Sequence, residues 1–486
     1  MMSILLVYPG VLIGRRGGIP CEGNGFPSLG VNYLATVLRK KGHNVVVQDA
    51  FSSQITGACG DIWELHKKLE KRVLDLKPDI VGISFLTPSR KESLCVARIV
   101  KRVEPNIRVV AGGPHATVMH NQLLANYPEI DVVVIGEAER TLCELVESFE
   151  IKECLHDVKG VAFRSGPSRA IVVSPRRPVI ENLDVIPFPD YGEYLRSLPN
   201  KRMSIASVVT GRGCPYGQCN FCASQSVWPG NRYRPVKNVV DEVEILVKEY
   251  GVENIHIHDD TFPSSGERAV RICKEVVKRG IEVIFDCKAT LNSVTPDFLY
   301  WYRKAGGRSI FFGLESGSQR VRELMGKPKV SNTQVESMVR TVREAGIKVG
   351  IFVMFGYPGE TSRDVQATCQ MLKRLNPDRV RCTLTKVYPG TRLYQYAKEH
   401  KMLTDDYWLS EASRHRYFSF AGDDEVAQIR KLDLLLRQEF CGLDLWSEYD
   451  EQDIPYADEN AGGRELDYST GHGSSKGRFR YRIAGR

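Results

Sequence analysis

The chain has 486 residues, with 67 Lys and Arg against 59 Asp and Glu and 42% hydrophobic residues. This length predicts about three globular units with enough buried core to do without disulfides. The net charge of +8 does not indicate a nucleic-acid partner, and no apolar run approaches the ~20 residues that span a bilayer. The 13 cysteines are scattered and odd in number, and no secretory signal is found. We therefore expect a cytoplasmic protein with reduced thiols.

Residues 1–150 alternate between short apolar strands and amphipathic helices. The expected strands are Ile4–Tyr8, Val45–Gln48, Asp79–Phe85, Arg108–Ala111 and Val132–Ile135. This alternation is typical of an α/β domain with a doubly wound parallel sheet covered on both faces. In such sheets ligands bind beyond the carboxyl ends of the strands, where glycines fall in this sequence.

Residues 151–202 have a different character. The apolar runs Val161–Phe163 and Ile171–Val173 flank a Ser-Gly-Pro-Ser turn and predict a hairpin. The prolines that follow predict an extended connector.

Strand–helix alternation resumes over residues 203–400. The expected strands are Ser204–Val209, Asn254–His258, Glu282–Asp286, Ser309–Phe312, Val349–Phe355 and Arg381–Val387. Six such units predict a partial or full parallel barrel with its site at the strand carboxyl ends. Residues 401–456 are expected to form a small helical cap, and the tail 457–486 is expected to be disordered.

Three cysteines, Cys214, Cys219 and Cys222, lie within nine residues directly after the first expected barrel strand. Three thiolates on one short loop can bind three irons of a cubane cluster and leave the fourth iron open to a chelating ligand. Spacing alone leaves a zinc site or chance as alternatives. Zinc usually takes four ligands, and only the remote His256 and His258 could supply one; packed polar residues are the better interpretation of both.

The residues around these cysteines carry a family resemblance. Arg-Gly-Cys-Pro-Tyr followed by Cys-Asn-Phe-Cys resembles the cluster loop of radical S-adenosylmethionine (SAM) enzymes. In that family three residues normally lie between the first two cysteines, whereas four lie between Cys214 and Cys219 here. We expect Gly217 to absorb the extra residue, because glycine tolerates unusual backbone angles.

The resemblance covers about residues 203–400 and implies a partial (β/α)6 radical SAM barrel that holds a [4Fe-4S] cluster and SAM. It implies that Glu315 holds the ribose hydroxyls, that two aspartates lie near the methionyl amine, and that glycine-rich backbone packs on adenine. The implied SAM-binding residues are Phe221, Asp259, Asp260, Glu315, Ser316, Gly356 and Pro358. The alternatives are a barrel-interior salt bridge for Glu315 and a helix cap for the two aspartates.

The turns of the first domain resemble those of the cobalamin-binding fold, in which a Ser-x-Leu turn and a later Gly-Gly pair admit the nucleotide tail. The residues that this implies for cobalamin binding are Ser84, Leu86, Thr87, Gly112, Gly113, His115, Gly136 and Glu137. An ordinary doubly wound domain with glycines at its turns is the alternative.

Cobalamin folds that coordinate cobalt from below carry an Asp-x-His-x-x-Gly loop after the second strand. The corresponding residues begin at Asp49 and place Phe51 at the His position and Gln54 at the Gly position. We therefore expect no histidine lower ligand. Cys21, Cys59 and Cys95 are spaced like the second cysteine trio of radical SAM methylthiotransferases, but their local contexts differ, so buried structural thiols are expected.

The domain order resembles that of cobalamin-dependent radical SAM enzymes. The leading hypothesis is a C-methyltransferase that uses a 5′-deoxyadenosyl radical and methylcobalamin to methylate an unactivated carbon under low oxygen. A ring-forming or rearranging enzyme with the same cofactors, and a non-catalytic cobalamin-binding protein, are the alternatives. The expected partners are a flavodoxin or ferredoxin as electron donor and a substrate that is a small molecule, lipid, tetrapyrrole or peptide.

An aromatic group in residues 401–456 bears on the substrate. Its members are Tyr407, Trp408, Tyr417, Phe418 and Phe420. We expect these side chains either to pack as the core of a helical unit, the favoured interpretation, or to cap the barrel mouth.

Overall fold

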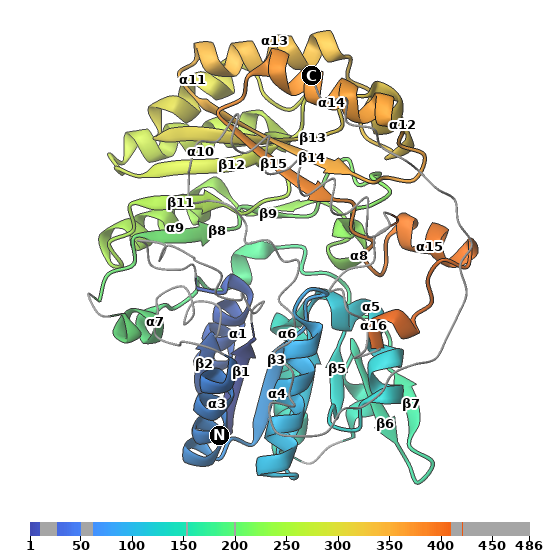
Figure 1. Cartoon of the computed structure of the whole chain (residues 1–486). Helices are drawn as coiled ribbons and strands as arrows, with labels where there is room; N and C mark the ends of the chain where they lie inside the picture. Colours follow the sequence, from blue (N-terminus) through green and yellow to red (C-terminus); the bar gives the residue numbers. More distant parts are fainter. Residues whose placement is uncertain (10–26, 50–61, 152–153, 199–200, 410–419, 421–486) are drawn as a thin grey trace.

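Two α/β units make up the computed structural model, which describes residues 1–9, 27–49, 62–151, 154–198, 201–409 and 420. One sheet and its helices form the lower half of Figure 1, and a second sheet with its helices forms the upper half. Among these described residues, no helix is both long and apolar enough to cross a membrane.

The first sheet has the strand order β2-β1-β3-β4-β5-β6-β7. Its strands are β1 Ser3–Tyr8, β2 Asn44–Asp49, β3 Ile80–Ser84, β4 Arg108–Gly112, β5 Val132–Val134, β6 Val161–Ser165 and β7 Ala170–Val173. The first five run parallel, and β6 and β7 add an antiparallel hairpin. The sheet therefore continues past residue 150, where the sequence predicted a hairpin and connector outside the first domain, because the free edge of β5 still offers backbone groups for pairing.

Helices cover both faces of this sheet, as the sequence predicts. Consecutive side chains of a strand point to opposite faces, and here both sets are buried. Leu5 and Val7 belong to one core cluster, and Ile4 and Leu6 belong to another. The first cluster lies under α3 Ile62–Leu76, α4 Arg90–Val103 and α5 Pro114–Asn126, and the second under α1 Leu29–Lys40 and α6 Ala138–Ile151. The strand order reverses between β1 and β3, which is where ligands bind in open sheets of this kind.

The second sheet is a partial barrel. Its parallel strands follow chain order: β8 Ile205–Val208, β11 Asn254–Ile257, β12 Ile284–Ala289, β13 Gly307–Glu315, β14 Lys348–Phe355 and β15 Arg379–Leu384. Within the described part of the chain β8 and β15 do not pair, so the barrel stays open. The connecting helices are α9 Val236–Lys248, α10 Glu267–Lys278, α11 Pro296–Lys304, α12 Gln319–Leu324, α13 Asn332–Glu344 and α14 Ser362–Leu375.

Alternating side chains of the barrel strands separate its core from its interior. Ile255 and Ile257 are buried in the core cluster shared with α9 and α10. His256, between them, faces the other side and pairs with Asp286 of β12. The neighbouring His258 lies on the same face, with its ring centre 5.3 Å from that of His256. His256 is therefore a packed polar residue, as expected, whereas His258 is exposed, and the expectation that it is packed is wrong.

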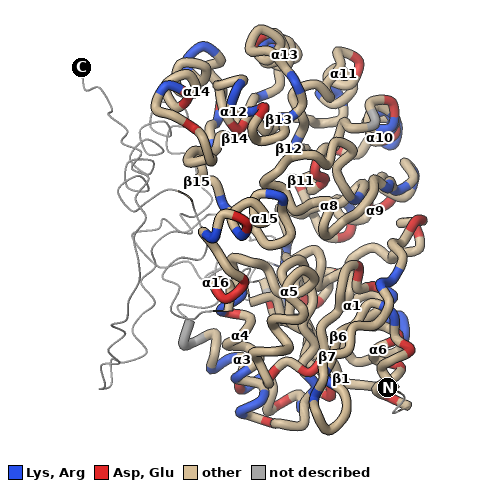
Figure 2. Tube along the Cα trace, turned by 90° about the vertical axis from the view of Figure 1, so that its right-hand side faces the viewer, with Lys and Arg blue, Asp and Glu red and all other residues tan. Residues whose placement is uncertain are grey.

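Short elements complete the described chain. They are η1 Leu155–Asp157, η2 Leu183–Val185, α7 Gly192–Ser197, β9 Gly211–Arg212, α8 Ser224–Val227, β10 Arg232–Tyr233, η3 Phe262–Ser265, α15 Arg392–Glu399 and α16 Asp406–Leu409. Figure 2 shows acidic and basic residues interspersed along the helices of both units.

The helix α16 lies beside α5 of the first unit (Figure 1), and α15 contributes Leu393, Tyr394 and Ala397 to the core cluster of that unit. Trp408 of α16 is only 2% exposed and belongs to the core cluster of that unit. Arg90 donates to its backbone oxygen at 3.2 Å and lies over its ring. Trp408 thus packs as core against the first domain and does not cap the barrel mouth. Tyr417, Phe418 and the expected disordered tail lie outside the described residues.

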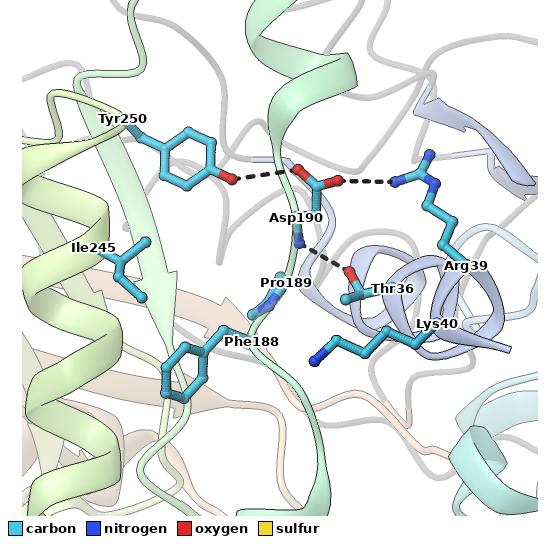
Figure 3. A pocket seen from close by; sticks show the side chains of 8 residues that line it. All are labelled: Thr36, Arg39, Lys40, Phe188, Pro189, Asp190, Ile245 and Tyr250. Carbon is cyan, nitrogen blue, oxygen red and sulfur yellow. Dashed lines mark hydrogen bonds and ion pairs between the residues drawn. The ribbon is translucent and has the colours of Figure 1, made fainter. Parts of the chain in front are cut away.

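The connector forms one side of a hollow of about 400 Å³ between α1 and α9 (Figure 3). There Asp190 joins the two units, because its backbone nitrogen donates to Thr36 at 2.9 Å and its carboxylate lies 3.7 Å from Arg39 and 3.3 Å from Tyr250. No residue predicted to bind a cofactor lines this hollow, which lies at the contact between the two units.

Candidate functional site

The three clustered cysteines lie on the loop between β9 and α8, at the carboxyl end of the first barrel strand. Cys214 and Cys219 are half-buried, and Cys222 is exposed. Burial raises the pKa of the Cys219 thiol. Because metals bind the thiolate form, iron binding at this loop must displace protons.

The described residues contain no group of three His, Cys, Asp or Glu side chains close enough to hold a single metal ion. A single zinc ion needs all of its ligands about 2.0–2.3 Å from one point. A cubane cluster places each cysteine on a different iron and therefore needs no such convergence. The zinc alternative gains no support from the described part of the chain.

Neighbouring elements hold the cluster loop by backbone contacts. The amide nitrogen of Asn220 donates to Met325 at 2.9 Å, and its oxygen accepts from the Leu393 amide at 2.8 Å. The Tyr216 hydroxyl donates to Gly326 at 2.9 Å. Gly217 has a φ of +59°, the unusual backbone angle that the sequence led us to expect there. The loop is thus fixed by the turn after α12 and by the start of α15.

Asp259 fixes the stem of the same loop. Its Oδ1 accepts from the amides of Thr210 and Gly211 at 2.6 and 3.2 Å, and its Oδ2 accepts from the Thr210 hydroxyl. The residue is 5% exposed. These bonds account for both carboxylate oxygens, so a contact between Asp259 and SAM stays a prediction. Asp260 is exposed and accepts a bond from Ser224, beside Cys222.

Glu315 and Lys327 form a buried ion pair next to the cysteines. Lys327 Nζ lies 3.3 Å from Glu315 Oε1, and the two side chains are 9% and 11% exposed. Burial opposes the lysine charge, but Glu315 and then Cys219 raise the pKa of Lys327. Sequence analysis missed Lys327, which follows a Met-Gly turn with no motif of its own. It brings a cation close to Glu315 and to Cys219 of the cluster loop.

Ser316, also predicted to bind SAM, is fully buried. Its hydroxyl lies 3.1 Å from the Thr368 hydroxyl and accepts from the Ser318 amide at 3.2 Å. These contacts tie the end of β13 to α14. Ser316 therefore stabilises the backbone at the end of β13, next to the site.

The predicted adenine-contacting loop follows β14. Gly356 has a φ of +75°, and its amide donates to Glu360 at 2.7 Å. Glu360 is 2% exposed, and its other oxygen has no partner among the described residues. Burial raises the pKa of Glu360 to about 7. Pro358 lies inside this loop, and Phe221 packs against the core cluster that includes Tyr357.

The predicted cobalamin turns interlock at the carboxyl ends of β3 and β4. The Phe85 amide donates to Gly112 at 2.7 Å, and the His115 amide donates to Phe85 at 3.1 Å. Gly113 has a φ of +97°, and a Cβ there would lie 2.9 Å from the Phe85 oxygen. Only glycine fits that position. Ser84 and Leu86 are half-buried on either side of Phe85.

His115 lies buried between these turns. It is 1% exposed, and its Nδ1 lies 3.1 Å from the hydroxyl of Thr87. Burial, with Arg90, lowers the pKa of His115 to about 3. Its Nε2 is buried with no partner in the described chain. A buried polar atom without a protein partner, beside closely packed backbone, fits a site for a large polar cofactor.

The carboxylate of Glu137, in the turn after β5, is held in ion pairs. Gly136 has a φ of +82°, and the Glu137 carboxylate that follows is paired with Arg212 and Arg232. The loop that lacks the expected lower-ligand histidine, together with Cys21 and Cys59, lies outside the described residues. Cys95 is half-buried on α4.

Comparisons with known proteins agree with this geometry. Residues 19–146 match the B12 binding domain, and residues 208–372 match the radical SAM superfamily. An uncharacterised methyltransferase of Pyrococcus horikoshii, PH0819, is 32% identical over 84% of this chain and 86% of its own. An anaerobic magnesium-protoporphyrin IX monomethyl ester cyclase of Rubrivivax gelatinosus is 29% identical over 81% of this chain and 70% of its own.

The fold also matches a solved structure. The radical SAM methyltransferase TsrM of Kitasatospora setae, determined with cobalamin and a [4Fe-4S] cluster, has a TM-score of 0.68 over 82% of this chain and 75% of its own, at 21% identity. At this identity the likeness concerns the fold alone.

Proposed function

This chain belongs to the cobalamin-dependent radical SAM enzymes, and on that premise we propose that it is a C-methyltransferase acting on an unactivated carbon. The observation that carries the proposal is the junction of the two domains, where the cluster loop is bonded to the cobalamin domain through buried side chains. The 32% identity to a protein named as a methyltransferase favours methyl transfer among the reactions of the family.

Cys214, Cys219 and Cys222 would hold the [4Fe-4S] cluster, which supplies one electron for the reductive cleavage of SAM. Lys327 offers a cation to the SAM carboxylate, and Asp260 offers an exposed carboxylate to its amine. We propose that Glu315, which pairs with Lys327, also accepts hydrogen bonds from the ribose hydroxyls. The Gly356–Glu360 loop, in which the Gly356 amide donates to Glu360, is proposed to pack on the adenine.

The turns at Thr87, Gly113 and His115 would hold cobalamin, which supplies the methyl group when bound. They fit the cofactor because the backbone at Gly113 leaves no room for a side chain and because the polar Nε2 of His115 is buried without a partner in the described chain. His115 is engaged by Thr87 within the turns. Because Phe51 stands where related folds carry the histidine that ligates cobalt, we propose that cobalt has no histidine lower ligand here.

Methylating one carbon in this way consumes two molecules of SAM. One gives up its methyl group and becomes S-adenosylhomocysteine. The other accepts an electron, breaks into methionine and a 5′-deoxyadenosyl fragment, and takes the substrate hydrogen to form 5′-deoxyadenosine. Balance requires two electrons in all, and we propose that a flavodoxin or ferredoxin supplies them. The substrate is a small molecule, lipid, tetrapyrrole or peptide.

A ring-forming reaction is the second candidate, because the relative from Rubrivivax gelatinosus is named as a cyclase. Such an enzyme uses the same cofactors without transferring a methyl group from SAM. Its product would form together with 5′-deoxyadenosine and without S-adenosylhomocysteine.

Anaerobic turnover tests the proposal. The protein reconstituted with iron, sulfide and cobalamin is incubated with SAM, a chemical reductant and fractions of a cell extract. We expect a fraction that causes S-adenosylhomocysteine and 5′-deoxyadenosine to form together with a product heavier by one CH2 unit. Cys222→Ala is expected to abolish 5′-deoxyadenosine, and Cys154→Ala, at an exposed cysteine outside the cluster loop, is expected to leave it unchanged. Product formation without cobalamin would contradict the proposal.

A further inference from the structure

A cluster of four buried charged side chains joins the two domains beside the cluster loop. Glu137 directly precedes α6, and Glu139 lies in the first turn of this helix. Arg212 and Arg232 lie on β9 and β10. Their side chains are 5–11% exposed. Two positive and two negative groups thus balance each other at the interface.

Arg212 contacts both carboxylates. Its Nη1 donates to Glu137 Oε1 at 2.8 Å, and its Nη2 donates to Glu139. The same guanidinium lies 4.9 Å from the centre of the Trp228 ring. Glu139 and then Glu137 raise the pKa of Arg212 further, although burial opposes its charge. The flat, forked guanidinium holds two carboxylates in fixed directions, whereas an ammonium group has three donors and no fixed fork.

Arg232 completes the network from the opposite strand, since β9 and β10 pair Arg212 with Arg232. Its Nη1 donates to the two oxygens of Glu137 at 2.8 and 3.0 Å and to the Ile180 oxygen at 2.8 Å. The Ile180 amide donates to Glu137 at 2.6 Å. Burial would raise the pKa of Glu137, but the Ile180 amide and Arg212 hold it below its ordinary value. The carboxylate is therefore charged and fixed from three directions.

Such a network is poorly explained as a source of stability. Removing charges from water costs several kcal/mol per ion, and buried ion pairs often do no better than apolar residues of the same size. The network instead fixes a position, because its hydrogen bonds hold the stem of the cluster loop in one place against the first domain. Only Gly213 separates Arg212 from Cys214.

We propose that Arg212 is a positioning residue that fixes the iron–sulfur loop on the cobalamin domain through Glu137 and Glu139. In this way it sets the distance between the [4Fe-4S] cluster and cobalamin. The inference rests on the proposed function only in requiring that both cofactors bind. It assigns Glu137 to the domain junction, in place of the contact with cobalamin that the sequence suggested.

The test measures this distance without a substrate. Reduction of the holoenzyme gives a paramagnetic cluster and paramagnetic cob(II)alamin, whose magnetic interaction in electron paramagnetic resonance spectra depends on their separation. We compare wild type with Arg212→Gln, Arg212→Lys and a control, Arg202→Gln. Arg202 pairs with Glu253 on the surface, where both side chains are 57% exposed, and such pairs contribute little.

We expect Arg212→Gln to bind iron and cobalamin normally. Its two spins should interact more weakly than those of wild type and with a wider range of strengths. Arg212→Lys should restore it in part, and Arg202→Gln should match wild type. With a substrate, Arg212→Gln should form methylated product up to about 100-fold more slowly, the effect of a displacement of about 1 Å. Its substrate-independent cleavage of SAM should persist.

An unchanged spin interaction in Arg212→Gln overturns the inference. If that variant does not fold, Glu139→Gln decides instead, because it removes one arm of the network and leaves the Glu137 pairs intact. A wild-type enzyme that shows the spin interaction but makes no methylated product refutes the proposed reaction alone. A wild type that binds no cobalamin overturns both.

Discussion

A methyl group added at Gly213 should displace the iron–sulfur loop. Gly213 has a φ of +88°, and a Cβ there would lie 1.9 Å from the Gly230 oxygen. Since real Cβ contacts are not shorter than 3.0 Å, the two backbone segments must separate by about 1.1 Å. A shift of about 1 Å can lower a reaction rate by about 100-fold. Cys214 is the next residue, so the shift falls directly on a cluster ligand.

Gly230→Ala is the matched control for Gly213→Ala. Gly230 has a nearly equal φ of +81°, but no heavy atom lies within 4 Å of its Cβ position. Both variants carry the cost of a left-handed alanine, roughly 1–2 kcal/mol, and they differ only in the collision. The assay is iron and sulfide content after anaerobic reconstitution, followed by the rate of 5′-deoxyadenosine formation. We expect Gly230→Ala to keep its cluster and Gly213→Ala to lose iron or at least about 100-fold in rate. Equal effects of the two variants would refute the reasoning.

Three further predictions concern single buried side chains. Lys327→Met leaves the Glu315 carboxylate unpaired, so we expect about 3–5 kcal/mol lower stability and weaker SAM binding by equilibrium dialysis; Lys329→Met, at an exposed lysine, should change neither. Because burial raises the pKa of Glu360 from 4.5 to about 7, the folded protein keeps a proton that the unfolded chain releases. This contribution to the free energy of unfolding is complete below pH 4.5 and is lost as the pH rises to about 7. In thermal unfolding across this range, the stability of Glu360→Gln should not show that fall. Identical pH profiles of stability for wild type and Glu360→Gln would contradict the prediction. Trp408→Ala should lower the free energy of unfolding in urea by about 3–5 kcal/mol, whereas a loss below 1 kcal/mol would show that α16 contributes little to the core.

Much of the fold can be predicted from the sequence because both sheets are built from parallel strands buried on one or both faces. Apolar runs such as Ile4–Tyr8 and Val349–Phe355 coincide with strands, since only hydrophobic side chains can fill such positions. The hairpin of β6 and β7 was expected, but its pairing with β5 at the edge of the first sheet was not. Which sheet edge a hairpin joins depends on backbone groups left free elsewhere in the fold.

The site was predicted less completely, for a related reason. A motif at a strand end places a residue near the site but does not name its partner. Asp259 and Glu137 are near the predicted site, yet their carboxylates bond to the loop stem and to the domain junction. Lys327 has no sequence signal, because its position beside Glu315 and the cysteines comes from a turn after α12 that only the tertiary structure brings there. Trp408, similarly, is assigned to the first domain by contacts far apart in the sequence.

The transfer of a labelled methyl group tests the central claim most directly. Reconstituted holoenzyme is incubated anaerobically with SAM carrying a trideuterated methyl group, a reductant and no substrate, and the corrinoid is then extracted for mass spectrometry. The proposed function predicts that the label is found on the corrinoid and that an equal amount of S-adenosylhomocysteine forms. A corrinoid that stays unlabelled while SAM is cleaved to 5′-deoxyadenosine would contradict methyl transfer and favour the ring-forming reaction.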